Sequence, residues 1–388
     1  VGKSGTVTIR AGGGMALGHG IRAGTLDLED KGENEDLHLH TEVDNLSVTM
    51  GEQSDFILEQ SGDLNISELK MNGGDVIIHA EADVTIQSIS GELGELHIVS
   101  ETGDIDIDGM QDNSQTMILE APQGQITAKI ETETLNVTAN GKIDITEADG
   151  LVVTHLLQKH TQNTVKIKVN DGTLKVSADV QAGPSMALVA DDLDIESHLS
   201  NAGTNFHVQP ATDDGKIVLG ATSSATSDGF HLHNDDLSKL HGGCEDLVVG
   251  SDQGSHEIHI GDAQDGSSKM NFNHGLTLKN PKQGGDIYIH GTVTGGSDGS
   301  FIIHGSGSTM YLNDSEIKVA GEQEYNDSVQ VSGDNLISTE SSLIIGTDSK
   351  QTLNGDSEPG ADTLTLSAGS DQDLIVNTVI GDTDPLEE

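Results

Sequence analysis

A short alternating segment that returns about every twenty residues constrains the fold of this chain more than any other feature. Its clearest copies are residues 63–67, 83–87 and 104–108, in each of which one polar residue separates two apolar residues. A second series of strand-like segments has the same spacing, at 56–58, 76–78, 96–99 and 117–119. Because side chains alternate between the two faces of a strand, each segment has an apolar face that stacked coils can bury. The pattern therefore predicts an all-β parallel β-helix, a β-solenoid of roughly twenty residues per coil.

The alternation also predicts which side chains point into the coils. One inward row comprises Leu64, Val84 and Ile105, and the adjacent inward row comprises Ile66, Ile86 and Ile107. Asp106 lies between two inward isoleucines and is therefore expected to face solvent. At this spacing the chain contains roughly nineteen coils, and a rise of about 4.8 Å per coil gives a rod of the order of 90 Å.

We expect residues 1–388 to form one continuous β-helix segment of a longer chain, with a looser joint near 209–244. Within that joint, residues 221–229 are low in complexity, whereas the strand-like segments on either side keep the spacing. Aromatic residues make up only 2% of the chain and Trp is absent, which favours stacks of Ile, Leu and Val over large rings as the core. No window shows an apolar stripe at helical spacing, so the sequence predicts no helix.

Charge limits the classes of partner. The chain has 18 basic and 65 acidic side chains and a formal net charge of -47. Nucleic acid is excluded as an expected partner, because phosphate binding needs clustered positive charge. No apolar run reaches the length of a membrane span, so no membrane insertion is expected. The single cysteine, Cys244, excludes an internal disulfide framework and a cysteine-based zinc site.

Several phrases in the C-terminal third are similar to those of a known class of repeat proteins. They occur at 247–261, 276–278, 284–291, 361–369 and 379–386, and include a Leu-Thr-Leu-Ser-Ala-Gly segment and an Ile-Gly turn before Pro-Leu. In these phrases the chain resembles the repeat region of giant bacterial exoproteins, the filamentous haemagglutinin-like adhesins of Gram-negative bacteria. The resemblance is clearest over 245–388. It implies a right-handed parallel β-helix, secretion or display at the cell surface, and a role in adhesion or extracellular scaffolding.

Two histidine pairs have a spacing that can present both rings to one metal ion. His38 and His40 share one face of a predicted strand, as do His231 and His233. Because the intervening leucines are expected to point inward, all four histidines are expected to project outward. We interpret them as solvated surface side chains rather than as metal ligands.

Carboxylates are the better candidates for cation binding, because Ca²⁺ takes six to eight oxygen ligands. The weak candidates are Asp262, Asp265, Asp104, Asp106 and Asp108. The repeated glycine-aspartate nonapeptide of calcium β-rolls is absent from the sequence. We therefore expect that the chain requires no cofactor. Bound Ca²⁺ is the alternative, and diffuse counterions around the acidic side chains are the simpler interpretation.

Catalytic residues are not expected. The chain has only two arginines, Arg10 and Arg22, and its three tyrosines lie in the C-terminal third. Neither a nucleophile elbow nor a phosphate-binding or dinucleotide-binding glycine loop is recognisable. No cofactor-binding residues are therefore assigned, and the chain is not expected to be an enzyme.

These observations favour a structural shaft segment of a giant extracellular or cell-surface fibre or adhesin. The alternatives are a carbohydrate-active β-helix enzyme and a calcium-dependent extracellular adhesion module. The expected partners are other copies of the chain, in lateral or end-to-end contact, and a cell-surface or glycan ligand. The expected location is secreted or at the cell surface of a Gram-negative bacterium.

Overall fold

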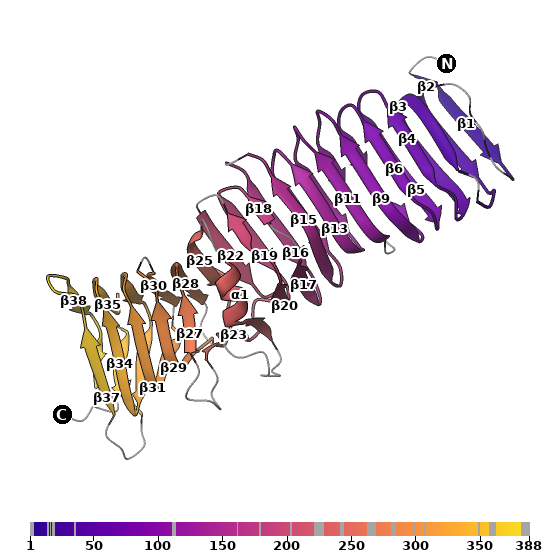
Figure 1. Ribbon diagram of the computed structural model, residues 1–388. Helices are drawn as coiled ribbons and strands as arrows, with labels where there is room; N and C mark the ends of the chain where they lie inside the picture. The colour runs from indigo at the N-terminus through magenta and orange to yellow at the C-terminus, as the bar shows by residue number, and fades with distance from the viewer. Residues whose placement is uncertain are drawn as a thin grey trace. The chain divides into compact units, whose positions relative to one another are not determined.

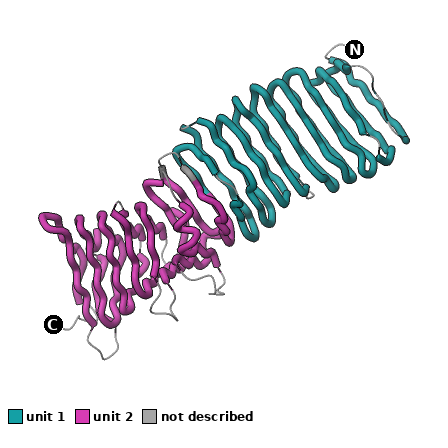
Figure 2. The backbone as a smooth tube through the Cα atoms, viewed as in Figure 1, with its two compact units in different colours: residues 1–187 teal, residues 188–388 magenta. Residues whose placement is uncertain are grey.

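The computed structural model shows an all-β parallel solenoid with about 15 turns (Figure 1). It describes residues 4–13, 15, 17, 20–34, 36–110, 114–160, 162–177, 180–201, 204–220, 229–240, 244–261, 269–280, 285–297, 299–305, 307–347, 350–356 and 362–381. The chain divides into two compact units, residues 1–187 and 188–388, which are coloured separately in Figure 2 and are described here one at a time.

The first unit is built from short parallel strands. Its strands are β1 (Thr6–Ala11), β2 (Ile21–Asp30), β3 (Leu37–Glu52), β4 (Phe56–Gln60), β5 (Leu64–Asn72), β6 (Val76–Ala80), β7 (Val84–Ile86), β8 (Ile89–Ser90), β9 (Leu93–Ser100), β10 (Ile105–Ile107), β11 (Ser114–Ala121), β12 (Ile126–Ile130), β13 (Thr132–Ala139), β14 (Ile143–Glu147), β15 (Leu151–Gln158), β16 (Thr164–Val169), β17 (Thr173–Val176) and β18 (Val180–Ala182). Strand β19 (Ser185–Val189) contains the division between the units.

The two interleaved series of the sequence form two ladders of paired strands in the first unit. One ladder runs through β3, β5, β7, β10, β12 and β14, and the other through β3, β4, β6, β9, β11 and β13. Strand β3 belongs to both because its two halves pair with different strands. Successive coils therefore add one strand to each ladder, as the repeat predicts.

The predicted inward rows are confirmed. Val84 pairs with Leu64 on one side and Ile105 on the other, and Ile86 pairs in the same way with Ile66 and Ile107. All six side chains are buried, whereas Asp106 between the last two isoleucines is exposed. The two rows stack in register, and the assignment of inward and outward faces is correct.

The second unit contains several longer coils. Its strands are β20 (Asp192–Ile195), β21 (Leu199–Asn201), β22 (Thr204–Gln209), β23 (Ile217–Leu219), β24 (Phe230–Leu232), β25 (Cys244–Gly250), β26 (Ile258–Ile260), β27 (Lys269–Phe272), β28 (Gly275–Asn280), β29 (Ile287–Gly295), β30 (Phe301–Gly305), β31 (Thr309–Val319), β32 (Gln323–Tyr325), β33 (Ser328–Ser332), β34 (Asp334–Thr339), β35 (Leu343–Ile345), β36 (Thr352–Gly355), β37 (Thr363–Ser367), β38 (Leu374–Val376) and β39 (Val379–Ile380).

The longer coils correct the predicted number of turns. Leu247 pairs with Leu276 and Ile258 with Ile287, so a coil here takes up more chain than the twenty-residue repeat of the first unit. A solenoid accommodates such lengthening in its loops because each coil contacts only its neighbours. The prediction of nineteen coils is wrong for this reason, because the structure has about 15 turns.

A short helix in the second unit was not predicted from the sequence. Helix α1 (Asn234–Lys239) has Asp235 and Asp236 in its first turn and Lys239 in its last turn. These charges interact favourably with the helix dipole. Asp236 accepts hydrogen bonds from the backbone N–H of His233 at 3.0 Å and of Ile195 at 3.3 Å. Six residues are too few to produce a helical apolar stripe, so the periodicity of the sequence could not reveal it.

Within the residues that the structure describes, no helix has the length and apolar character needed to cross a bilayer.

Aspartates at the turns tie successive coils together. A carboxylate oxygen of Asp55 accepts a hydrogen bond from the backbone N–H of Asp75, and Asp75 accepts one from Glu95, each at 2.8 Å. A second ladder of the same kind joins Asp83 to Asp104 at 2.8 Å and Asp104 to Gln125 at 2.9 Å. Part of the chain's acidity is therefore structural, since a carboxylate satisfies a backbone donor at the edge of the next strand.

We expect Asp104→Ala to lower the free energy of unfolding by about 1 kcal/mol. The change removes the acceptor of the Gln125 N–H and of the Gln125 side-chain amide, which donates to Asp104 at 3.0 Å. Urea denaturation followed by circular dichroism measures the effect. Asp106→Ala is the matched control, because Asp106 is exposed in the same coil, and its effect should stay within about 0.5 kcal/mol. Equal effects of the two substitutions would show that the turn ladder adds no stability.

Candidate functional site

The most compact group of potential ligands lies on strands β3 and β4. His38 and His40 flank Leu39, which is buried, and the alternation of the strand turns both imidazoles outward. Glu59 of β4 is the register partner of His40 in the next coil. Two histidines from one strand and one carboxylate from its neighbour thus share one patch of surface.

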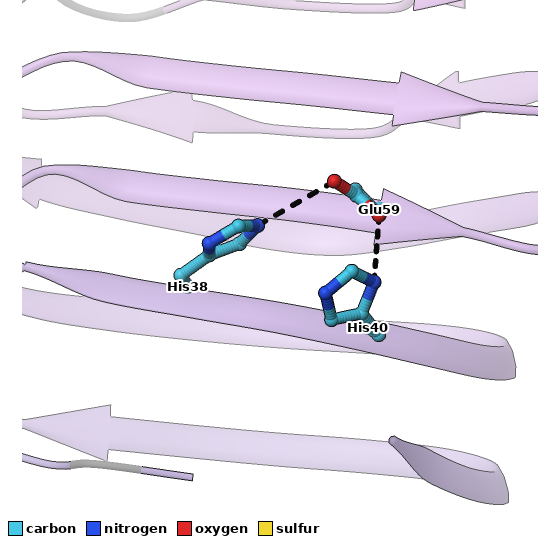
Figure 3. A group of neighbouring side chains, drawn as sticks. All are labelled: His38, His40 and Glu59. Atoms are coloured by element: carbon cyan, nitrogen blue, oxygen red, sulfur yellow. Dashed lines mark ion pairs between the residues drawn. The ribbon is translucent and has the colours of Figure 1, made fainter. Parts of the chain in front are cut away.

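The three side chains face one another closely (Figure 3). Nδ1 of His40 lies 2.6 Å from Oε2 of Glu59, and Nε2 of His38 lies 3.6 Å from Oε1 of the same carboxylate. The two imidazole rings are tilted by 32°, with their centroids 5.2 Å apart. Among the residues that the structure describes, this is the one group in which three ligand atoms from His, Cys, Asp or Glu all lie within 4.8 Å of one another.

A shallow hollow of about 210 Å³ adjoins this group. His40 and Glu59 line it together with Gln60, His79 and Glu101. His79 is the register partner of Glu59 in the following coil, and its Nε2 lies 3.0 Å from Oε1 of Glu101. Gln60 is buried, and its amide donates to the carbonyl oxygen of Val43 at 2.7 Å. Imidazole and carboxylate groups therefore alternate along the wall from one coil to the next.

The second histidine pair lies in a different environment. The rings of His231 and His233 are stacked, with centroids 5.8 Å apart and planes inclined by 7°. Nδ1 of His231 lies 3.8 Å from Oδ1 of Asp192. Burial lowers the pKa of His231, although the Asp192 carboxylate acts in the opposite direction. His231 is partly buried rather than freely solvated, so the expected exposure of this pair is only partly correct.

The three predicted calcium ligands that the structure describes, Asp104, Asp106 and Asp108, do not form a comparable group. Asp104 uses both carboxylate oxygens to accept hydrogen bonds from Gln125, and Asp108 forms an ion pair with Lys129 at 2.7 Å. The hydrogen bond and charge of Lys129 lower the pKa of Asp108. Asp106 is exposed, and Asp262 and Asp265 lie outside the described residues.

A row of stacked rings on the outward face of the second unit was not predicted from the sequence. His259, Tyr288 and Tyr311 occupy successive register positions on β26, β29 and β31. The ring centroids are 4.8 Å apart between His259 and Tyr288 and 4.9 Å apart between the two tyrosines. Burial lowers the pKa of His259 and raises that of Tyr288. Because the rings cover one another's faces, the row stabilises the stack rather than offering open faces to a sugar.

A second, larger hollow lies on the second unit. It has a volume of about 430 Å³, and Thr294, Lys318, Ser338 and Glu340 are among its lining residues. The lining supplies one carboxylate and one ammonium group. Glycoside hydrolysis generally needs two carboxylates that flank the scissile bond, so this hollow does not favour the carbohydrate-active alternative.

The comparisons with known proteins found no match: no family model fits the chain, and neither the curated proteins nor the solved structures include a significant relative. The group of His38, His40 and Glu59 can hold a proton or a metal ion between imidazole and carboxylate, and its position on an exposed strand face leaves it open to solvent.

Proposed function

We propose that this chain is a non-catalytic shaft segment of an extracellular or cell-surface fibre or adhesin, of the filamentous haemagglutinin-like class of Gram-negative bacteria. The observation that carries the proposal is the in-register stacking of coils within each unit. Backbone ladders continue from coil to coil, and inward rows such as Leu64, Val84 and Ile105 fill the interior. A stack of this kind is stabilised by contacts between neighbouring coils throughout, which suits a spacer better than a catalyst.

The outward face also supports this proposal. It carries polar and acidic side chains, and the net charge of -47 keeps copies of such a stack soluble by mutual repulsion. The described hollows are partly open to solvent rather than enclosed, unlike most small-molecule sites. A ligand of this shaft is expected to be a glycan or another cell-surface component, bound along the outside of the coils.

We also propose end-to-end contact between copies of the chain. The strands β38 and β39 carry the exposed large apolar side chains of the described residues: Leu374, Ile375, Val379 and Ile380. The exposed fraction reaches 59% for Ile380. Another parallel strand added beside β38 and β39, from the same chain or from another copy, would cover these side chains.

An antibody raised against the purified chain should label the outer surface of intact source cells. Immunogold electron microscopy shows whether the label follows fibres that extend from the cell. Cells permeabilised before labelling are the control for total protein. Label that appears only after permeabilisation would contradict the proposed surface role.

A further inference from the structure

The group of His38, His40 and Glu59 combines donor atoms that suit transition metals. Imidazole nitrogen and carboxylate oxygen are both common ligands of Zn²⁺, and catalytic or exchangeable zinc sites often have three protein ligands and one water. The two imidazoles come from one strand and the carboxylate from the register partner of His40, so the backbone ladder fixes their relative positions. A charged surface with random geometry does not supply this combination.

The geometry needs only a small adjustment. The three ligand atoms lie within 4.8 Å of one another, whereas ligand atoms of a tetrahedral zinc site are about 3.3 Å apart. The side chains of His38, His40 and Glu59 are 53%, 62% and 49% exposed, so each is free to rotate toward a common centre. The strands beneath them, which are anchored by buried Leu37, Leu39 and Leu58, need not move.

We propose that His38, His40 and Glu59 bind one divalent first-row transition-metal ion of the Zn²⁺ type, with water completing its coordination. This site is independent of the proposed shaft function. Its ligand set distinguishes it from the general attraction of cations to an acidic surface. Ca²⁺ and Mg²⁺ prefer oxygen ligands and gain little from two imidazoles, whereas Zn²⁺, Co²⁺ and Cu²⁺ bind imidazole well.

The neighbouring coil defines the limits of the site. His79 is also a register partner of Glu59, but its Nε2 lies 3.0 Å from Oε1 of Glu101 and is engaged there. The adjoining hollow of about 210 Å³ gives solvent and the hydrated ion access to the carboxylate. Further along the same unit, His97 forms a single pair with Glu120 at 3.3 Å. His97 has a carboxylate partner but no second imidazole in this pair, which makes it the natural control.

Titration of the untagged full chain with Co²⁺, followed by its visible absorption, and with Zn²⁺, followed by calorimetry, tests the proposal. Wild-type protein should bind one more equivalent than His38→Ala/His40→Ala, and Glu59→Gln should weaken binding of that equivalent at least about tenfold. His97→Ala should bind like wild type. Binding should weaken as the pH falls, because protons compete with the metal for imidazole. Excess Ca²⁺ should not displace the ion.

Two results would overturn the proposal. One is equal stoichiometry and affinity in wild type and in the His38→Ala/His40→Ala variant. The other is complete displacement of Zn²⁺ by Ca²⁺, which would show diffuse attraction to the acidic surface. Circular dichroism of each variant verifies that the coils are intact, and the exposed positions of the substituted side chains favour that outcome. If His38, His40 and Glu59 only form an imidazole–carboxylate contact between coils, their substitution should change the stability of the protein, and wild-type protein should show no cobalt absorption band.

Discussion

Ile145→Asp is expected to lower the free energy of unfolding of the first unit by about 5 kcal/mol. Ile145 is fully buried in β14, where its register partners are Ala128 and Ile167 in the coils on either side. The substitution removes a large apolar side chain and places a carboxylate where it has no water. Urea denaturation followed by circular dichroism measures the loss, and hydrogen exchange shows how many coils open.

The adjacent residue provides a matched control. Thr146 faces outward on the same strand, and its register partners are Lys129 and Lys168. Thr146→Asp introduces the same carboxylate between two ammonium groups, so its effect on stability should stay within about 1 kcal/mol. A similar loss in both variants would contradict the division of β14 into inward and outward faces.

Asp327→Asn is expected to stabilise the protein at pH 8 by up to about 4 kcal/mol and to have little effect at pH 4. Asp327 is 1% exposed, and burial raises the pKa of its carboxyl to about 7. The nearby Ser308 and Gly307 amides act to lower this pKa, but among the described residues neither carboxylate oxygen accepts a hydrogen bond of normal geometry. Ionisation therefore leaves a buried charge without adequate compensation.

The direction of the pH effect follows from the raised pKa. The folded state holds the Asp327 proton more tightly than the unfolded state, whose carboxyl has a pKa near the ordinary value of 3.8. Stability is thus fully retained below about pH 4 and is lost progressively as the pH rises to about 7. Urea midpoints at pH 4 and pH 8 measure the difference. Asp106→Asn removes an exposed carboxylate and corrects for the general relief of charge repulsion. An equal pH dependence in both variants would refute the role of Asp327.

The sequence determined the core of the first unit in detail because its repeat is nearly constant there. Leu64 and Ile66 are matched by hydrophobic residues at the same phase in the next two coils, and the register followed from the alternation alone. The second unit has insertions between strands, as between Leu247 and its partner Leu276. Periodicity cannot specify where such an insertion leaves the coil, so the number of turns was overestimated.

The candidate site was only half predictable for the same reason. The spacing of His38 and His40 follows from the geometry of one strand and could be recognised in the sequence. Glu59 joins them from another coil, and its position depends on a register that shifts whenever a turn gains or loses a residue. The row formed by Tyr288 and Tyr311 depends on the same cross-coil register. Contacts within a strand can be predicted from the local sequence, whereas contacts between coils depend on the length of every turn between them.

The aspartate ladders give the stack a direction. In each step that joins Asp55, Asp75 and Glu95, the carboxylate belongs to the earlier coil and the amide to the later one. The step from Asp314 to the Asp334 amide in the second unit, at 3.0 Å, has the same sense. In these steps a coil presents a carboxylate acceptor to the later coil and a backbone donor to the earlier one. Two copies that join by this chemistry must do so head to tail, an asymmetric contact that does not close on itself and leads to a polar filament rather than a symmetric dimer.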